Sequence, residues 1–147
     1  MEALEGLERE NLSKRIREID GIAPNYATQK LKNIGICTVQ NLLDKGCTRN
    51  GRIEMAEKTG ISETLILEWV NMADLFRIEE IGEEHLNLLK EAGVDTVVEL
   101  SKRIPEDLHA KLKEEKEKLA HFRQLPSLEM VRKWIEQAKK LPRVIEY

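Results

Sequence analysis

Hydrophobic residues recur every three or four positions along most of the chain, the spacing that places them on one face of an α-helix. The first such stretch covers residues 3–19, where the apolar positions are Leu4, Leu7, Leu12, Ile16 and Ile19. Another begins at Pro105, which suits the first turn of a helix, and the acidic Glu106 and Asp107 follow it. No segment has the alternation typical of a half-buried strand. We therefore predict an all-α fold.

Two further helices are predicted around the tryptophans. One follows Ser62, a suitable N-cap, and places Trp69 on its apolar face. The last helix follows Ser127 and ends before Pro142, and its apolar positions are Met130, Val131, Trp134, Ile135, Ala138 and Leu141. Because Trp69 and Trp134 lie on these apolar faces, we expect both side chains to be buried.

A short pattern occurs twice in the chain. The first copy contains Ile34-Gly35-Ile36 followed by Thr38 and Leu42, and the second contains Ala92-Gly93-Val94 followed by Thr96 and Leu100. Each copy is preceded by another glycine-containing turn, Ile19-Asp20-Gly21-Ile22-Ala23 in the first and Ile78-Glu79-Glu80-Ile81-Gly82 in the second. Tight connections between helices require a positive φ that glycine tolerates best. The repetition indicates two equivalent helical units.

This pattern resembles the helix-hairpin-helix motif, whose hairpin usually reads apolar-x-Gly-apolar-Gly. With residues 69–75, Leu125-Pro126-Ser127 and Leu141-Pro142-Arg143, the chain is identified as a member of the domain-of-unknown-function 4332 family of tandem helix-hairpin-helix proteins, over about residues 16–147. The resemblance implies one compact helical domain over 1–147. A first helix-hairpin-helix unit would span 12–75, and a second with a C-terminal helical pair would span 76–147. No established activity comes with the resemblance.

The first hairpin is a candidate phosphate-binding site. Many helix-hairpin-helix proteins use the hairpin to grip a nucleic-acid backbone without reading sequence, and the unpaired N–H groups that begin a helix suit an anion. The candidate residues here are Gly21, Ile22, Ala23, Lys30 and Lys32. Ala23 replaces the second glycine of the motif. A hairpin that serves only to connect two packed helices remains an alternative.

The second hairpin has the opposite charge. Glu79, Glu80, Glu83 and Glu84 place four carboxylates where a phosphate would approach, and Glu80 replaces the first glycine. Residues 61–101 carry a net charge of −8, whereas residues 9–60 and 102–147 each carry +4. Such an acidic docking face would repel nucleic acid and attract a basic protein partner.

Residues 51–62 have the spacing of a helix-turn-helix corner, with Ala56 at the helix crossing and Gly60 in the turn. Reading bases would require Arg, Lys, Asn or Gln at the exposed start of the second helix. That surface instead carries Glu63, Thr64, Leu67 and Glu68. We therefore interpret this segment as a packed helical corner.

Composition narrows the function further. The 147-residue chain has a net charge of −3 and a pI near 5.7, so it does not resemble a basic nucleic-acid coat. We expect no membrane span, no leader and no metal or cofactor, because the apolar runs are short, the first residues are acidic and the three histidines are scattered. Cys37 and Cys47 fit a reducing cytoplasm, and we expect both to be buried as small hydrophobes.

The sequence thus predicts a cytoplasmic, non-catalytic helical binding or scaffold module whose partner is a protein. The alternative is sequence-nonspecific binding of a nucleic-acid backbone through the first hairpin. The acidic docking face supports the first interpretation, and Lys30 and Lys32 support the second.

Overall fold

The computed structural model of the chain describes residues 23–78, 81–118 and 125–147. These ranges contain eight α-helices and no β-strand, which confirms the predicted all-α fold. The helices are α2 (Asn25–Asn33), α3 (Val39–Gly46), α4 (Arg49–Thr59), α5 (Glu63–Leu75), α6 (Glu83–Glu91), α7 (Val97–Ser101), α8 (Pro105–Lys118) and α9 (Leu128–Lys140). The helix predicted over 3–19 lies outside the described residues. Gly21 and Ile22 of the first predicted hairpin, and Glu79 and Glu80 of the second, lie outside them as well, so the two helix-hairpin-helix units stay a prediction.

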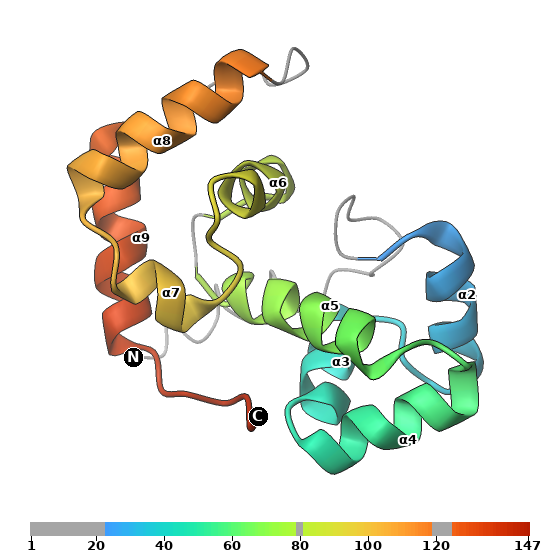
Figure 1. Cartoon of the computed structure of the whole chain (residues 1–147). Coiled ribbons are helices and arrows are strands. Elements are labelled where there is room, and N and C mark those ends of the chain that lie inside the picture. The colour runs from blue at the N-terminus through green and yellow to red at the C-terminus, as the bar shows by residue number, and fades with distance from the viewer. Residues whose placement is uncertain (1–22, 79–80, 119–124) are drawn as a thin grey trace.

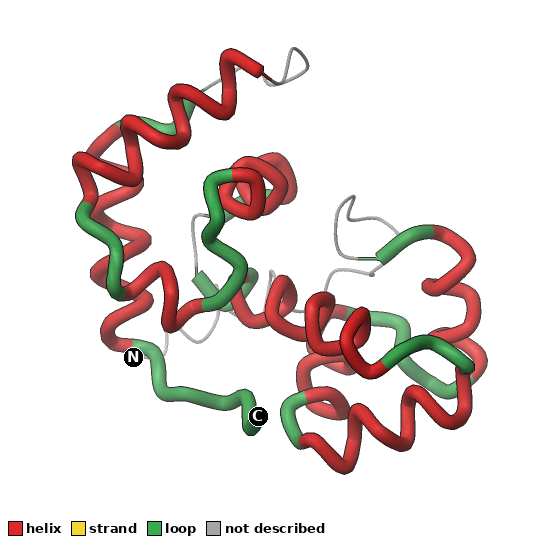
Figure 2. The backbone as a smooth tube through the Cα atoms, viewed as in Figure 1, coloured by secondary structure: helices red, strands yellow, loops and turns green. Residues whose placement is uncertain are grey.

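Helix α5 lies between two groups of helices (Figure 1). On one side α3 and α4 pack against it, and α2 packs against α4; on the other side α7 contacts it. The second group is held together by α9, which packs against α7 and α8, while α6 packs against α8. Beyond α9 the final segment, residues 141–147, is an extended loop that runs back toward α3 and α4 (Figure 2). The final segment therefore connects the second group of helices back to the first.

Two glycines allow helices α3, α4 and α5 to approach one another closely. A Cβ atom on Gly46 would lie 2.3 Å from Cγ2 of Val70 in α5, and one on Gly51 would lie 1.9 Å from the carbonyl oxygen of Lys45. Both distances are far below van der Waals contact. The absence of a side chain at these two positions therefore sets the packing of the first group.

The first glycine turn, between α2 and α3, has a defined local structure. Gly35 has a φ of +85°, and the N–H of Ile36 donates to the carbonyl of Leu31 over 2.9 Å. This is the bond that closes a Schellman turn, where glycine is favoured because it adopts left-handed backbone without strain. Thr38 then caps α3, its hydroxyl accepting the N–H of Asn41 at 3.0 Å.

The second glycine turn, between α6 and α7, repeats this structure. Gly93 has a φ of +87°, and the N–H of Val94 donates to the carbonyl of Leu89 over 2.8 Å. The hydroxyl of Thr96 accepts the N–H of Glu99 at 2.9 Å and caps α7. The repeated Gly-x-x-Thr pattern in the sequence therefore corresponds to one local geometry that occurs twice.

Several predicted helix ends are confirmed. Ser62 caps α5 by accepting the N–H of Leu65 at 3.2 Å, and Ser127 caps α9 by accepting the N–H of Met130 at 3.1 Å. Helix α8 begins at Pro105, as its fixed φ favours. Short polar side chains and proline thus locate these helix starts from the sequence alone.

Arg52 fastens the final segment to the first group. Its side chain is 4% exposed, and its guanidinium donates to the carbonyl of Gly46 at 2.7 Å and to the carbonyl of Glu146 at 2.5 Å. The backbone N–H of Glu146 donates in turn to the carbonyl of Cys47 at 2.7 Å. One arginine therefore ties α4, the end of α3 and the final segment together.

Arg77 provides a second attachment for the same segment. Its buried guanidinium donates to Asp74 at 3.1 Å and to the carbonyl of Pro142 at 3.1 Å. Between the two attachments Ile145 is buried in the core. The final segment is therefore part of the packed structure.

The prediction that both cysteines are buried is wrong. Cys37 is exposed and Cys47 is half-buried. Cys37 lies directly after the first glycine turn, between the buried Ile36 and the N-cap Thr38, and its side chain faces away from the core. Its backbone N–H donates to Oδ1 of Asn41. The apolar character of cysteine could not predict whether its side chain is buried in a loop, because a loop has no helical period that assigns residues to a buried face.

Both tryptophans are buried, as predicted: Trp69 is 5% exposed and Trp134 is fully buried. The indole of Trp134 in α9 lies 5.0 Å from the ring of His85 in α6, measured between centroids. In the described part of the chain its N–H has no hydrogen-bond partner. Trp134 therefore contributes through packing.

We expect Trp134→Ala to lower the free energy of unfolding by about 3–5 kcal/mol, because it leaves a large cavity between α9 and its neighbours. Trp134→Phe, which loses volume but no hydrogen bond, should cost clearly less. Urea denaturation followed by circular dichroism measures both, with Leu65→Ala at a 37% exposed position as the control. A loss below about 1 kcal/mol for Trp134→Ala would contradict the packing described here.

We expect Arg52→Met to destabilise the protein by about 1–3 kcal/mol for each carbonyl left buried without a partner. Arg49→Met on the exposed side of the same helix is the matched control and should change stability by less than about 0.5 kcal/mol. Hydrogen exchange should also show faster exchange at the Glu146 amide in Arg52→Met, since its bond to Cys47 depends on this attachment. Equal stability of the two variants would show that Arg52 is dispensable.

Candidate functional site

The surface of α2 carries the described part of the candidate phosphate-binding hairpin. Gly21 and Ile22 lie outside the described residues, and Ala23 is half-buried just before the helix. Lys30 and Lys32 are exposed in the last turns of α2. The structure therefore places two of the five predicted residues on an accessible helix face and does not test their relation to the hairpin.

An aromatic residue that the sequence analysis did not select lies on this face. Tyr26 is 58% exposed, and Nζ of Lys30 lies 5.9 Å from the centre of its ring. The spacing of four residues that brings them together is one helical turn, so this pair was readable from the sequence once α2 was assigned. An exposed aromatic ring beside lysines is a typical stacking platform for single-stranded nucleic acid.

The acidic docking face is described only in part. Glu79 and Glu80 lie outside the described residues, and Glu83 and Glu84 begin α6, where their side chains are not described. The helix start itself is defined, because the N–H of Gly82 donates to Nδ1 of His85 at 3.0 Å. The proximity of the four glutamates therefore stays a prediction.

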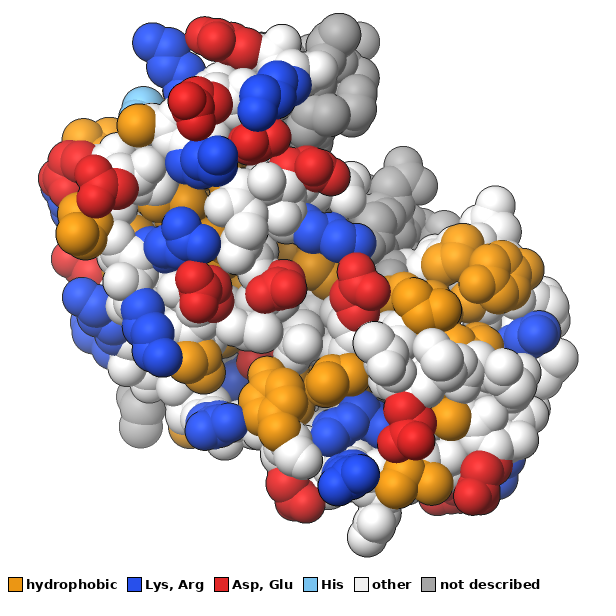
Figure 3. Space-filling view, in the orientation of Figure 1, with side chains coloured by type: hydrophobic (Ala, Val, Ile, Leu, Met, Phe, Trp, Pro, Cys, Tyr) orange, Lys and Arg blue, Asp and Glu red, His pale blue; other side chains and the backbone are white. Residues whose placement is uncertain are grey.

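Two acidic residues missed by the sequence analysis flank the second glycine turn. Glu91 and Asp95 are exposed, two positions before and two after Gly93. The equivalent positions around the first turn are Asn33 and Cys37, which carry no charge. Aligning the two copies of the repeat would have revealed this difference. In Figure 3, Asp and Glu side chains lie in a row across the middle of the face, over α5 and α7.

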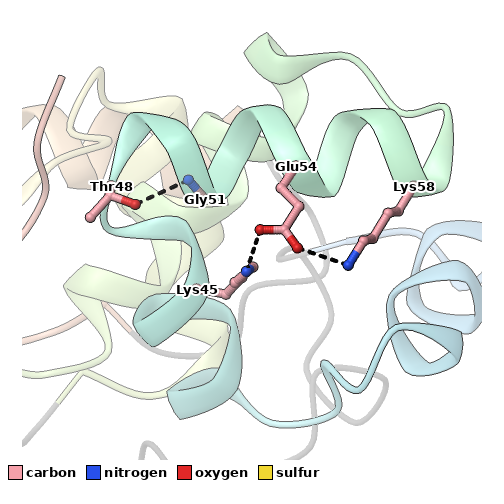
Figure 4. Close-up of polar contacts among 5 residues, drawn as sticks. All are labelled: Lys45, Thr48, Gly51, Glu54 and Lys58. Carbon is pink, nitrogen blue, oxygen red and sulfur yellow. Dashed lines mark hydrogen bonds and ion pairs between the residues drawn. The ribbon is translucent and has the colours of Figure 1, made fainter.

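A surface hollow of about 370 Å³ lies beside the first glycine turn, between α3 and α4. The carboxylate of Glu54 reaches Nζ of Lys45 at 2.6 Å and Nζ of Lys58 at 2.8 Å, and Figure 4 shows it between the two lysines. The same view shows the Thr48 hydroxyl accepting the N–H of Gly51 at the start of α4. The hollow thus contains an internal ion triad.

The two lysines determine the charge state of this triad. Hydrogen bonds from Lys45 and Lys58, and then their positive charges, lower the pKa of Glu54 from 4.5 to about 2. Glu54 therefore stays ionised at neutral pH and is unsuited to act as a general acid. Because its carboxylate already occupies the position between the lysines, the hollow is a poor site for an external anion.

A smaller groove of about 180 Å³ lies between α7, α9 and the final segment. Its walls combine polar residues, among them Asp74, Thr96 and Ser101, with apolar or aromatic ones: Val97, Val98, Ala138, Leu141, Ile145 and Tyr147. Val98 is 39% exposed and Tyr147 50% exposed at its edge. The sequence analysis missed this groove, because its walls come from α7 and from the end of α9 with the final segment, which are far apart in the sequence and which only the fold brings together.

Tyr147 is held at the edge of the groove. Its hydroxyl contacts Oδ1 of Asn71 at 3.0 Å, and the guanidinium of Arg143 lies 5.2 Å from the centre of its ring. Burial, and then the negative charge of Asp74, raise the pKa of Tyr147. The phenol therefore remains protonated at neutral pH and donates its hydrogen bond to Asn71.

Within residues 23–78, 81–118 and 125–147, no group of three or more His, Cys, Asp or Glu side chains is placed to hold a metal ion. In the same ranges no helix is long and apolar enough to cross a membrane. The candidate sites are the α2 face with Tyr26 and Lys30, the acidic turn at Gly93, which Glu91 and Asp95 flank, and the groove beside α7 and α9.

The order of elements and both glycine turns lie within residues 20–141, which match the family model described as Domain of unknown function (DUF4332). The chain belongs to the DUF4332 family. The resemblance in the sequence is thereby confirmed at the level of the family. Comparison with curated proteins gives no significant match, and neither does comparison with solved structures. Membership of the DUF4332 family therefore assigns no activity to the sites described above.

We expect the stabilising contribution of Glu54 to depend on pH in a defined direction. Its folded-state pKa of about 2 lies below the ordinary 4.5, so the contribution is fully present above about pH 4.5 and is lost as the pH falls through about 2. Urea denaturation should therefore show Glu54→Gln as less stable than the natural protein at pH 7, with the difference shrinking toward pH 2.

The exposed Glu57→Gln on the same helix is the control for the loss of one surface charge. Because the triad is partly solvated, added salt should reduce the difference between Glu54→Gln and the natural protein. A difference that stays constant from pH 7 to pH 2 would contradict the assigned ionisation of Glu54.

Proposed function

We propose that this DUF4332 protein is a cytoplasmic, non-catalytic helical binding module whose acidic surface docks a basic protein partner. The observation that carries the proposal is the pair Glu91 and Asp95, which lie exposed on either side of the second glycine turn. Neither carboxylate has an ion-pair partner among the described residues. Both are therefore available to an external cation.

The rigid setting of these two carboxylates supports recognition. The turn between them is fixed by the positive φ of Gly93 and by the bond from Val94 to Leu89, while Thr96 caps the next helix. Binding of a partner therefore costs little conformational entropy for ordering this surface. The net charge of −8 over residues 61–101 adds long-range attraction for a basic partner.

Binding of a nucleic-acid backbone is a second candidate, and the exposed Tyr26 beside Lys30 favours it. Lys30 and Lys32 would contact phosphates, and the ring of Tyr26 would stack on a base of a single strand. The hairpin of Gly21, Ile22 and Ala23 would supply backbone N–H groups, as the resemblance implies. The acidic turn at Gly93 would have to face away from the nucleic acid.

Two charge-reversal pairs separate these candidates. We expect Glu91→Lys with Asp95→Lys to weaken binding of a basic partner at least about tenfold, mainly through slower association, while Lys30→Glu with Lys32→Glu leaves it nearly unchanged. The partner is first isolated from nuclease-treated extract and then titrated as a pure protein. Unchanged affinity in the Glu91→Lys, Asp95→Lys variant would remove the acidic-surface proposal.

The same variants test nucleic-acid binding by electrophoretic titration with single-stranded and duplex DNA at about 50 mM and about 200 mM salt, a range over which phosphate contacts weaken steeply. Under the leading proposal, micromolar protein gives no shift at the lower salt. A sequence-independent shift that Lys30→Glu with Lys32→Glu abolishes would favour the second candidate. Tyr26→Ala would then weaken single-strand binding more than duplex binding.

A further inference from the structure

The groove between α7, α9 and the final segment presents apolar side chains to solvent around a defined hollow. Val98 and Tyr147, which line it, are 39% and 50% exposed, respectively. The hollow of about 180 Å³ has the volume of about six water molecules, enough for an aliphatic side chain. The part of the lining formed by Val97, Ala138 and Ile145 offers few hydrogen bonds to such waters, so their displacement from that part by an apolar group is favourable.

The walls of this groove are held in place before any partner arrives. Pro142 is fixed by Arg77, Tyr147 by its bond to Asn71, and Ile145 by burial in the core. Helix α9 is tied to α7 by direct packing. A ligand therefore meets a formed site and does not have to order a loop.

Two cationic side chains lie on one side of the groove. Lys139 and Arg143 line it, and Lys140 lies exposed beside them. In the described ranges none of the three has a carboxylate partner. Two acidic residues are also close: Asp74 lines the hollow and is paired with Arg77, and the charge of Asp95 acts on Tyr147. Figure 3 shows hydrophobic side chains gathered near the C-terminal end, with Lys and Arg side chains on both sides.

We propose that this groove binds a short segment of a partner protein that carries an aliphatic side chain flanked by carboxylates. The aliphatic group enters the hollow between Val97, Ala138 and Ile145, and the carboxylates meet Lys139 and Arg143. Apolar burial supplies affinity, and these two cationic side chains set the orientation of the segment. This surface has the opposite charge preference from the acidic turn at Gly93, so the protein presents two sites for two kinds of segment.

A displayed library of random dodecapeptides, selected on the folded protein at low salt, tests this preference. We expect enrichment of sequences in which Leu, Ile or Val lies next to Asp or Glu. The most enriched peptide is then synthesised with a fluorescent label and titrated by anisotropy. Enrichment of basic sequences, of sequences without an aliphatic residue, or of none at all would overturn the proposal.

Variants locate the binding site of that peptide. Val98→Asp should weaken its binding at least tenfold, and so should Lys139→Glu with Arg143→Glu, whereas the controls Leu65→Asp and Lys113→Glu should have little effect. Circular dichroism verifies that each variant is folded. If Val98→Asp does not fold, the Lys139→Glu, Arg143→Glu variant tests the binding site on its own. Peptide affinity that is unchanged in the folded groove variants would overturn the proposal.

Sedimentation of the natural protein distinguishes a second copy as the occupant. A dimer that Val98→Asp converts to monomer would show that the groove binds another molecule of this chain, and the proposed partner segment would be wrong. The acidic-surface function is tested by Glu91→Lys with Asp95→Lys, which leaves the residues that line the groove unchanged. Failure of one proposal therefore remains distinguishable from failure of the other.

Discussion

The buried guanidinium of Arg52 is the interaction on which the closure of the chain depends. A guanidinium removed from water must find acceptors, because an unsatisfied buried charge costs several kcal/mol. Gly46 and Glu146 provide them through backbone carbonyls, one at the end of α3 and one in the final segment. The end of α3 is also where a helix dipole favours positive charge. The position of Glu146 is thereby coupled to the packing of α3 and α4, since its partner Arg52 lies 94 positions earlier in the chain.

This closure has consequences for the second group of helices. Once the final segment is fastened at Glu146 and, through Arg77, at Pro142, the intervening Ile145 is directed into the core. The same course of the backbone makes the segment one wall of the groove beside α7 and α9. The groove therefore owes its shape to polar contacts made outside it, and its stability is tied to the global fold.

Much of the local structure was predictable from the sequence, because it is set by residues close together in the chain. The glycines at 35 and 93 specify left-handed turns, and the nearby threonines and serines specify helix starts. The helical period predicted the burial of Trp69 and Trp134. These features need no knowledge of the tertiary structure, since their hydrogen bonds span five residues or fewer.

The contacts between distant segments could not be predicted in the same way. Nothing near Arg52 in the sequence shows that its partner is Glu146, and an arginine on a helix is ordinarily expected in solvent. The exposure of Cys37 likewise depends on the backbone path after the first glycine turn, which the sequence pattern does not specify. The proposed acidic docking face and the phosphate-binding hairpin stay predictions, and the division into units 12–75 and 76–147 does so too.

The two glycine turns show how one backbone structure can support different surfaces. Lys32 and Lys90 occupy equivalent positions, three residues before Gly35 and Gly93, yet Lys90 is neutralised by Glu68 at 2.9 Å while no ion pair holds Lys32 in the described ranges. The uncharged Asn33 and Cys37 correspond to Glu91 and Asp95. Glycine, threonine and buried leucine define the turn, and the positions between them face solvent. Because these outward positions carry no structural constraint from the turn, their charges are free to differ, and the difference gives the two turns opposite electrostatic preferences.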